Sequence, residues 1–259
     1  MSVSRAKPAR LARATEKRFA FYDLDGTLVD LNLVHATLFI LANLGEWKNR
    51  VSYLLAFAAR APRLYRAEQR DRRLLNTVMF EAFRGVSHDR LLTLGEEYCD
   101  RVLRKHLYPH AVSMLHANHD AGIEPVIVTG SPDFVVAPIA RELGVEHFAA
   151  NRFVYRSGKA TGRLVEPVMA SDEKADWCAE FAAGRGVDLR DCWGYADSHY
   201  DLAFLAALGH PVCVNPDRKL KSAAATRQWP IVYFDRAEPA GDDDIDSLWP
   251  HMGDPDGPS

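Results

Sequence analysis

The stretch RFAFYDLDGTL, residues 18–28, decides how this chain folds. Its first half is apolar on both faces and rich in aromatic residues, which is typical of a strand buried between two layers of helices. The strand is expected to end where Gly26 and Thr27 begin a turn. If the backbone stays extended to that point, Asp23 and Asp25 lie on one face, because the side chains of a strand alternate with a period of two.

The pattern changes to helical after this strand. Apolar residues recur every three or four positions in four segments, which predicts helices over residues 33–44, 47–59, 68–83 and 87–106. From Pro109 onward, predicted helices alternate with predicted strands. The helices are expected over 111–121, 172–183 and 199–208, and the strands over 123–129, 192–196 and 212–214, with a further strand near residue 147. Residues 153–165 are expected to form a hairpin.

Repeated strand and helix units indicate an α/β fold with a Rossmann-like, doubly wound and mainly parallel sheet. Ser131 is expected to cap one of its helices, with Pro132 at the first helical position. In such sheets the functional groups lie at the carboxyl ends of the strands.

The pattern also divides the chain into regions. Residues 19–31 and 110–236 are expected to form the α/β core, residues 32–109 an inserted all-helical cap, residues 1–18 a basic tail and residues 237–259 an acidic flexible tail. With 47% hydrophobic residues the chain has enough apolar side chains for a substantial core. Its formal net charge of −3 predicts no general affinity for nucleic acid.

Three further observations concern the cellular setting. The longest uncharged stretch, residues 31–45, is shorter than the roughly 20 apolar residues that a bilayer span requires, so no transmembrane helix is expected. Cys99, Cys178, Cys192 and Cys213 are far apart and form no C-x-x-C pair, which favours free thiols in a reducing compartment. No apolar segment typical of a secretion signal follows the basic start of the sequence, and a cytoplasmic location is therefore expected.

Polar side chains gather at the carboxyl ends of the predicted strands. Besides Asp23 and Asp25, a later strand is followed by Asp197 and then Asp201, and Lys174 lies in the first turn of a helix. Four carboxylates that meet one lysine repel each other unless a divalent cation neutralises them. Ligand sets made only of oxygen suit Mg²⁺, so the sequence predicts a magnesium site.

These segments resemble the four ordered motifs of the haloacid dehalogenase superfamily. The motifs are DLDGTL at residues 23–28, the apolar strand that ends in Thr129-Gly130, Lys174, and DSHYD at residues 197–201. The helical block follows the first motif, where the phosphoserine-phosphatase-like branch carries its cap. The resemblance implies an enzyme that hydrolyses a small phosphate monoester with the help of Mg²⁺.

The resemblance also implies a role for each motif. Asp23 would be the nucleophile that forms an aspartyl-phosphate, and Asp25 would protonate the leaving oxygen and later activate water. Thr129, the N–H of Gly130 and Lys174 would bind the phosphate. Asp23, the main-chain carbonyl of Asp25 and Asp197 would hold the metal, and Asp201 would orient the metal site or Lys174. Asp25 also argues against dehalogenation, since a leaving halide needs no acid.

Several alternatives stay open from sequence alone. Each motif taken singly is compatible with an ordinary turn, helix cap or solvated helix face. The aspartyl-phosphate could pass to another hydroxyl in a phosphotransferase or mutase, and the fold could also serve as a non-catalytic binding module. The cap arginines are either a solvated helix face or a surface that attracts anionic lipid headgroups or an acidic substrate; they are Arg60, Arg63, Arg66, Arg70, Arg72 and Arg73.

The substrate is not determined by the motifs. Arg84 is a candidate substrate contact from the cap. Asn32 stands where phosphoserine phosphatases usually carry an acidic residue, so phosphoserine, other phosphorylated alcohols and lipid phosphates all remain candidates. The sequence leaves the oligomeric state open as well.

Overall fold

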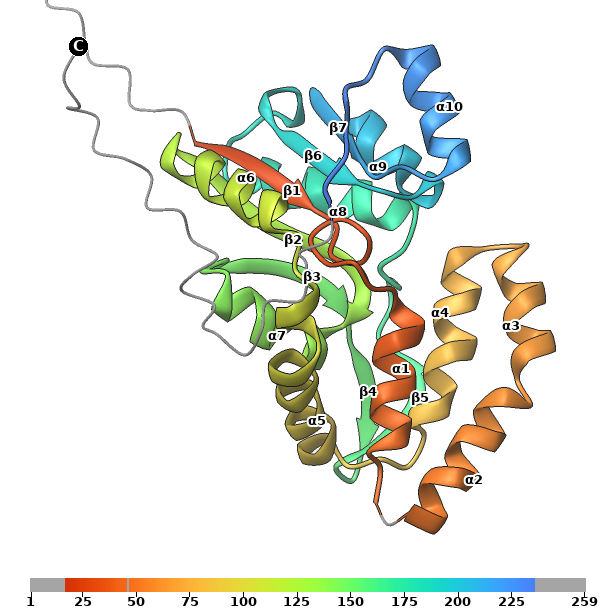
Figure 1. Ribbon diagram of the computed structural model, residues 1–259. Helices are drawn as coiled ribbons and strands as arrows, with labels where there is room; N and C mark the ends of the chain where they lie inside the picture. Colours follow the sequence, from red (N-terminus) through yellow and green to blue (C-terminus); the bar gives the residue numbers. More distant parts are fainter. Residues whose placement is uncertain (1–16, 46, 236–259) are drawn as a thin grey trace, which may run out of the picture.

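The computed structural model describes residues 17–45 and 47–235, and its centre is a six-stranded sheet (Figure 1). The strand order is β3-β2-β1-β6-β7-β8, and neighbouring strands pair in parallel throughout. The strands are β1 (Arg18–Tyr22), β2 (Ile123–Pro132), β3 (His147–Asn151), β6 (Trp193–Ala196), β7 (His210–Val214) and β8 (Ile231–Val232). This sheet confirms the predicted α/β fold with a doubly wound parallel core.

Helices cover both faces of the sheet, which explains why β1 is apolar on both sides. Phe19 and Phe21 pack in one cluster with α8 (Asp172–Ala183), α9 (Leu202–Ala207) and α10 (Arg218–Arg227). Ala20 and Tyr22, on the opposite face of the strand, belong to the cluster that includes α6 (Pro109–Asp120) and α7 (Asp133–Glu142). All four side chains are fully buried, so β1 is held from both layers.

Between β1 and α6 the chain forms a run of helices that lies beyond the carboxyl end of β1 (Figure 1). It comprises α1 (Leu33–Ala42), α2 (Trp47–Ala58), α3 (Ala61–Glu68), α4 (Arg72–Phe80) and α5 (His88–Arg101), with short 3₁₀ turns η1 (Glu81–Phe83) and η2 (Leu103–His106). Two other 3₁₀ turns lie outside this run, next to β6: η3 (Leu189–Asp191) and η4 (His199–Asp201). The division of the chain into a core and a cap at residues 32–109 stays a prediction.

Helix α3 was not predicted, and the helix expected over 68–83 is shorter. Asp71 explains the break, because its side chain accepts a hydrogen bond from the N–H of Arg73 and thereby starts a new helix, α4. Pro62 lies at the start of α3, where its missing N–H removes no helical hydrogen bond.

A hairpin that follows β3 packs against the helical run. Strands β4 (Phe153–Arg156) and β5 (Lys159–Leu164) pair in antiparallel fashion, as predicted for residues 153–165. The hairpin contacts α4 and η1, and the N–H of Gly85 donates to the carbonyl of Ala160 at 2.8 Å. The helices are therefore braced against a segment that follows β3 in sequence.

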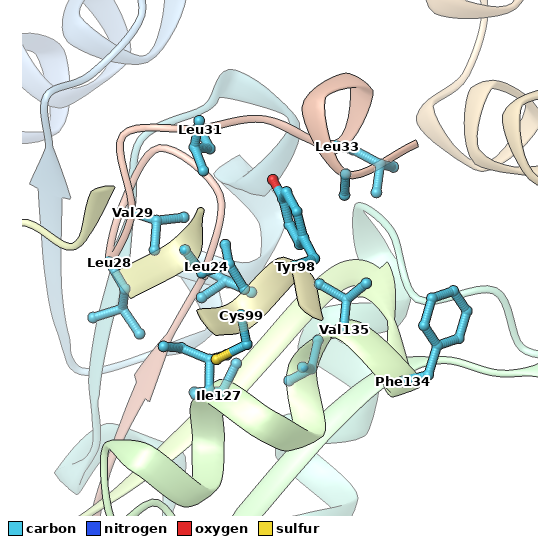
Figure 2. Close-up of a cluster of buried hydrophobic side chains, with 14 of the residues drawn as sticks. Leu24, Leu28, Val29, Leu31, Leu33, Tyr98, Cys99, Ile127, Phe134 and Val135 are labelled. Atoms are coloured by element: carbon cyan, nitrogen blue, oxygen red, sulfur yellow. The ribbon is translucent and has the colours of Figure 1, made fainter. Parts of the chain in front are cut away.

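The loop after β1 is anchored by apolar side chains. Leu24, Leu28 and Val29 are buried against Tyr98 and Cys99 of α5, Ile127 of β2, and Phe134 and Val135 of α7 (Figure 2). Because this loop carries Asp23 and Asp25, the packing restrains both carboxyl groups.

Three sequence-based expectations concern the chain as a whole. Within residues 17–45 and 47–235, no helix is both long and apolar enough to cross a lipid bilayer. The four cysteines are buried free thiols, as expected. The acidic tail, 237–259, and all but the last two residues of the basic tail, 1–18, lie outside the described residues.

Candidate active site

The predicted site residues meet at the carboxyl ends of three adjacent strands. Asp23 follows β1, Thr129 lies near the end of β2, and Asp197 follows β6, while β2 and β6 flank β1 in the sheet. All three line one cavity of about 340 Å³, together with Asp25 and Lys174. Residues 31–33 and side chains of α3 and α4 line the same cavity, which therefore lies between the sheet and the helical run.

A tight turn after β1 brings Asp23 and Asp25 into the cavity. The N–H of Asp23 donates to the carbonyl of Tyr195 at 2.9 Å, and the N–H of Gly26 donates to the carbonyl of Val29 at 2.8 Å. Gly26 has a φ of +78°, a conformation that glycine adopts without a steric penalty. A Cβ atom at this position would overlap the carboxylate of Asp197, so glycine is required for close approach as well.

Lys174 on α8 joins two of the carboxylates. Its Nζ lies 2.9 Å from Oδ1 of Asp23 and 2.6 Å from Oδ1 of Asp201, and all three side chains are buried. Burial by itself lowers the pKa of an amine, but the charges of Asp201 and Asp23 outweigh that effect and raise the pKa of Lys174. The lysine is therefore positively charged between the two acids.

The carboxylates also fit a divalent cation. One oxygen each of Asp23, Asp197 and Asp201 lies within 4.8 Å of the others, and hard oxygen ligands are those that Mg²⁺ prefers. Burial, together with the negative charges of Asp23 and Asp201, raises the pKa of Asp197 well above its ordinary value. One lysine leaves part of this charge uncompensated, so the donor set and the charge balance both suit Mg²⁺.

Asp25 has the surroundings of a proton donor. Burial, and to a lesser extent the negative charge of Asp23, raises the pKa of Asp25 to about 6. The hydroxyl of Ser131 donates to its Oδ2 at 2.6 Å and fixes the orientation of the carboxyl group. A carboxyl group with such a pKa can give and take a proton near neutral pH.

The expected helix cap at Ser131 is wrong. β2 continues to Pro132, which is the N-cap of α7, and the helix begins at Asp133. The hydroxyl of Ser131 is directed to Asp25, so this serine belongs to the site. The sequence did not indicate this role, because a serine followed by proline is typical of the start of a helix.

The end of β2, which contains Thr129 and Gly130, is held by Asn151 of the neighbouring strand β3. The amide nitrogen of Asn151 donates to the carbonyl of Gly130 at 2.7 Å and to that of Met169 at 3.2 Å, and its amide oxygen accepts from the N–H of Met169 at 2.8 Å. Thr129 is fully buried, and its Oγ1 accepts the N–H of Ser131 at 3.1 Å. These contacts fix the end of β2, where Thr129 and Gly130 line the cavity.

The helical run adds cavity residues that sequence reasoning did not single out. Glu68, Arg72 and Asn76 line the cavity, and the guanidinium of Arg72 lies 5.2 Å from the ring centre of Tyr200. The hydroxyl of Tyr200 donates to the carbonyl of Glu68 at 3.0 Å, which ties the helices to η4. Arg72 was named only together with five other arginines, for which attraction of an acidic substrate was one interpretation. The spacing of Arg72 and Asn76, one helical turn apart, was the signal that could have placed both residues at the site.

Arg84 lies elsewhere. It is exposed, packs beside Gly162 of β5, and is absent from the cavity lining within residues 17–45 and 47–235. Of the arginine cluster, Arg63 pairs with Glu81 at 3.2 Å, and Arg73 forms an ion pair with Glu173 of α8. These two arginines have local partners, and Arg72 faces the site.

Together, the fold and the site define a class of α/β proteins that carry a carboxylate-rich crevice at the carboxyl ends of the central strands. The sequence profile of the haloacid dehalogenase-like hydrolases matches residues 20–206. This chain therefore belongs to the haloacid dehalogenase-like hydrolase family, which confirms the resemblance seen in its motifs.

Individual relatives agree with this assignment. A probable phosphatase of Mycobacterium tuberculosis is 38% identical over 130 residues, which are 50% of this chain and 45% of that protein. A phosphoserine phosphatase of the same species is 29% identical over 217 residues, covering 83% of this chain and 70% of that protein. The match to the first relative thus covers less than half, 45%, of the length of that protein.

A solved structure shows the same fold. A protein of unknown function from Bordetella pertussis has a TM-score of 0.72 and 28% sequence identity, with 84% of this chain and 99% of that chain covered. The likeness to a phosphoserine phosphatase in sequence agrees with the branch that the position of the helical run implied.

Proposed function

We propose that this protein is a Mg²⁺-dependent phosphatase that hydrolyses a small phosphate monoester through an aspartyl-phosphate on Asp23. The observation that carries the proposal is the ion pair of buried Lys174 with Asp23, at 2.9 Å, in the cavity that Asp25 and Asp197 also line. This arrangement presents a carboxylate oxygen to the substrate beside a positive charge that can balance the phosphate. The relatives that are named as phosphatases support the same chemistry.

The chain's own groups account for both steps. An oxygen of Asp23 attacks phosphorus, and Asp25 gives its proton to the leaving alcohol oxygen, so the P–O ester bond breaks as the new P–O bond forms. Asp25, now ionised, then takes a proton from the water that attacks the aspartyl-phosphate, and phosphate leaves with Asp23 restored. The hydroxyl of Ser131 holds Asp25 in place in both steps.

The remaining residues bind charge. Thr129, the N–H of Gly130 and Lys174 bind phosphate oxygens, and Asp201 holds Lys174 at 2.6 Å. Asp23, Asp197 and the main-chain carbonyl of Asp25 would hold Mg²⁺, which supplies positive charge to the phosphoryl group when it is bound. We also propose that residues 32–109 act as a cap that excludes water from the cavity, and that the protein is cytoplasmic, in keeping with its four free thiols.

Two alternatives use the same site. A phosphotransferase or mutase would pass the phosphoryl group from Asp23 to another hydroxyl instead of to water, and a binding module would keep the pocket without turnover. The relatives that are named as phosphatases favour hydrolysis over transfer. The pKa of Asp25, raised by burial to about 6, favours catalysis over binding alone, because such a carboxyl group can give and take a proton. Product analysis with an added alcohol separates transfer from hydrolysis.

The test measures phosphate release from p-nitrophenyl phosphate by the full chain with Mg²⁺ and with EDTA. Asp23→Asn is expected to abolish turnover while the circular dichroism spectrum is unchanged, since the amide cannot act as the nucleophile. EDTA is expected to abolish turnover of the wild type. Turnover by Asp23→Asn equal to that of the wild type would remove the nucleophile from the proposal.

A further inference from the structure

Asn76 on α4 is a buried polar side chain that lines the cavity. It is fully buried, and among the residues that the structure describes, neither its amide nitrogen nor its amide oxygen has a hydrogen-bond partner. A buried amide without partners is unfavourable for folding, and native structures rarely retain one without a reason.

The position of Asn76 connects it with the end of β2, where phosphate is proposed to bind. A Cβ atom built on Gly130 would lie 3.0 Å from Nδ2 of Asn76, so this amide is directed at the end of β2 from the side of the helical run. Arg72, which precedes Asn76 by one helical turn, lines the same cavity. Helix α4 therefore presents two polar side chains to the site, while its Leu75, Val78 and Met79 are buried apolar side chains.

A second asparagine beside the end of β2 shows the contrast. Asn151 is 1% exposed and is hydrogen-bonded at both ends of its amide, to the backbone of Gly130 and of Met169. Asn151 stabilises the end of β2, whereas Asn76 makes no hydrogen bond to it among the described residues. The donor and acceptor of Asn76 thus lack a partner, and the cavity that Asn76 lines is where a ligand would supply one.

We propose that Asn76 is a residue that determines substrate specificity, with its amide nitrogen bound to an oxygen of the phosphate ester. Its amide oxygen accepts a hydrogen bond from a hydroxyl or ammonium group on the carbon next to the ester carbon. The inference rests on the proposed phosphatase function and adds the substrate class: phosphate monoesters of alcohols that carry a hydrogen-bond donor beside the ester.

Charge and covalent geometry lead to this class. A phosphate oxygen bound at Gly130 accepts hydrogen bonds, so it can accept one from Nδ2 of Asn76. The two polar atoms of one amide are close together, so the substrate group that donates to Oδ1 must be near the ester. Glu68, which also lines the cavity, is a second acceptor on the side of the helical run. An alcohol without a donor would leave Oδ1 of Asn76 buried and unpaired, and such sites reject the analogue that lacks the polar group.

Three esters of the same size test the proposal with the full chain and Mg²⁺: 2-aminoethyl phosphate, 2-hydroxyethyl phosphate and n-propyl phosphate. The wild type is expected to favour one or both donor-bearing esters over n-propyl phosphate by at least about tenfold in kcat/KM. The ratio between the amino and hydroxy esters tells which donor is preferred. Asn76→Leu removes both polar atoms at similar size and is expected to reduce the preference over n-propyl phosphate to about twofold or less.

Asn76→Asp keeps the acceptor and loses the donor. It is expected to retain the preference for donor-bearing esters while kcat/KM falls for all three. The Leu variant also corrects for the differences in leaving-group acidity among the esters, because these differences are the same in both proteins.

Stability separates this role from a structural one. Asn76→Leu is expected to unfold at the same or a higher urea concentration than the wild type, because it removes unpaired buried polar atoms, whereas Asn151→Leu is expected to unfold at a lower one. Equal kcat/KM values of the wild type for all three esters, or an unchanged preference in Asn76→Leu, would overturn the inference. Failure of the wild type to hydrolyse any ester with Mg²⁺ would instead show that the proposed function itself is wrong.

Discussion

Replacing Lys174 by methionine should destabilise the protein strongly, because the lysine compensates two buried acids. Its Nζ lies 2.9 Å from Asp23 and 2.6 Å from Asp201, with 5% of the lysine side chain exposed. At an effective dielectric constant of about 20, unit charges at these distances attract each other by about 6 kcal/mol per pair. Desolvation of the charges offsets much of this, and breaking a buried pair typically costs about 3–5 kcal/mol.

Urea unfolding in EDTA at pH 7, followed by tryptophan fluorescence, measures the loss. The free energy of unfolding is expected to fall by about 3–5 kcal/mol in Lys174→Met. The matched control is Lys159→Met, in which an exposed lysine of β5 is replaced and the loss should stay below about 0.5 kcal/mol. Adding Asp201→Leu to Lys174→Met should recover part of the loss, since one uncompensated charge is removed.

A loss in Lys174→Met that equals the loss in Lys159→Met would refute the reasoning. It would mean that other groups compensate the charges of the two acids, and that the ion pairs of Lys174 do not contribute to the free energy of unfolding.

Two further predictions concern the frame of the site. Gly26→Ala should lower both stability and kcat/KM by more than Gly85→Ala. Both glycines have a positive φ, but only at Gly26 would the new Cβ atom overlap a side chain, that of Asp197. Thermal unfolding and the phosphatase assay compare the two variants, and equal effects would contradict the claim. Asp217→Ala should lower the free energy of unfolding at pH 7 by about 1–2 kcal/mol, because the carboxylate caps α10. Although partial burial raises the pKa of Asp217, hydrogen bonds from His199 and from the start of α10 lower it below its ordinary value. The difference between wild type and variant should therefore be present above the unfolded-state pKa and disappear as pH falls below about 4; a difference that does not change with pH would count against the cap.

Local sequence predicted much of the fold because its signals depend on near neighbours. The apolar stretch before Asp23 gave the buried strand, and Gly26 marked the turn after it, since backbone preferences and burial act within a few residues. The hairpin over residues 153–165 was predicted for the same reason. The break at Asp71, which divides α3 from α4, was missed, because an apolar helical period continued on both sides of a capping residue.

Sequence alone therefore determined the fold class, the family motifs and the set of acids and the lysine that meet at the sheet. Tertiary structure decided which side chains join them. Ser131 contacts Asp25 across 106 residues, and Asn76 approaches Gly130 from a helix outside the sheet. Such contacts depend on how the helical run packs against the sheet, and no local pattern encodes that packing because it results from the burial of many distant side chains at once.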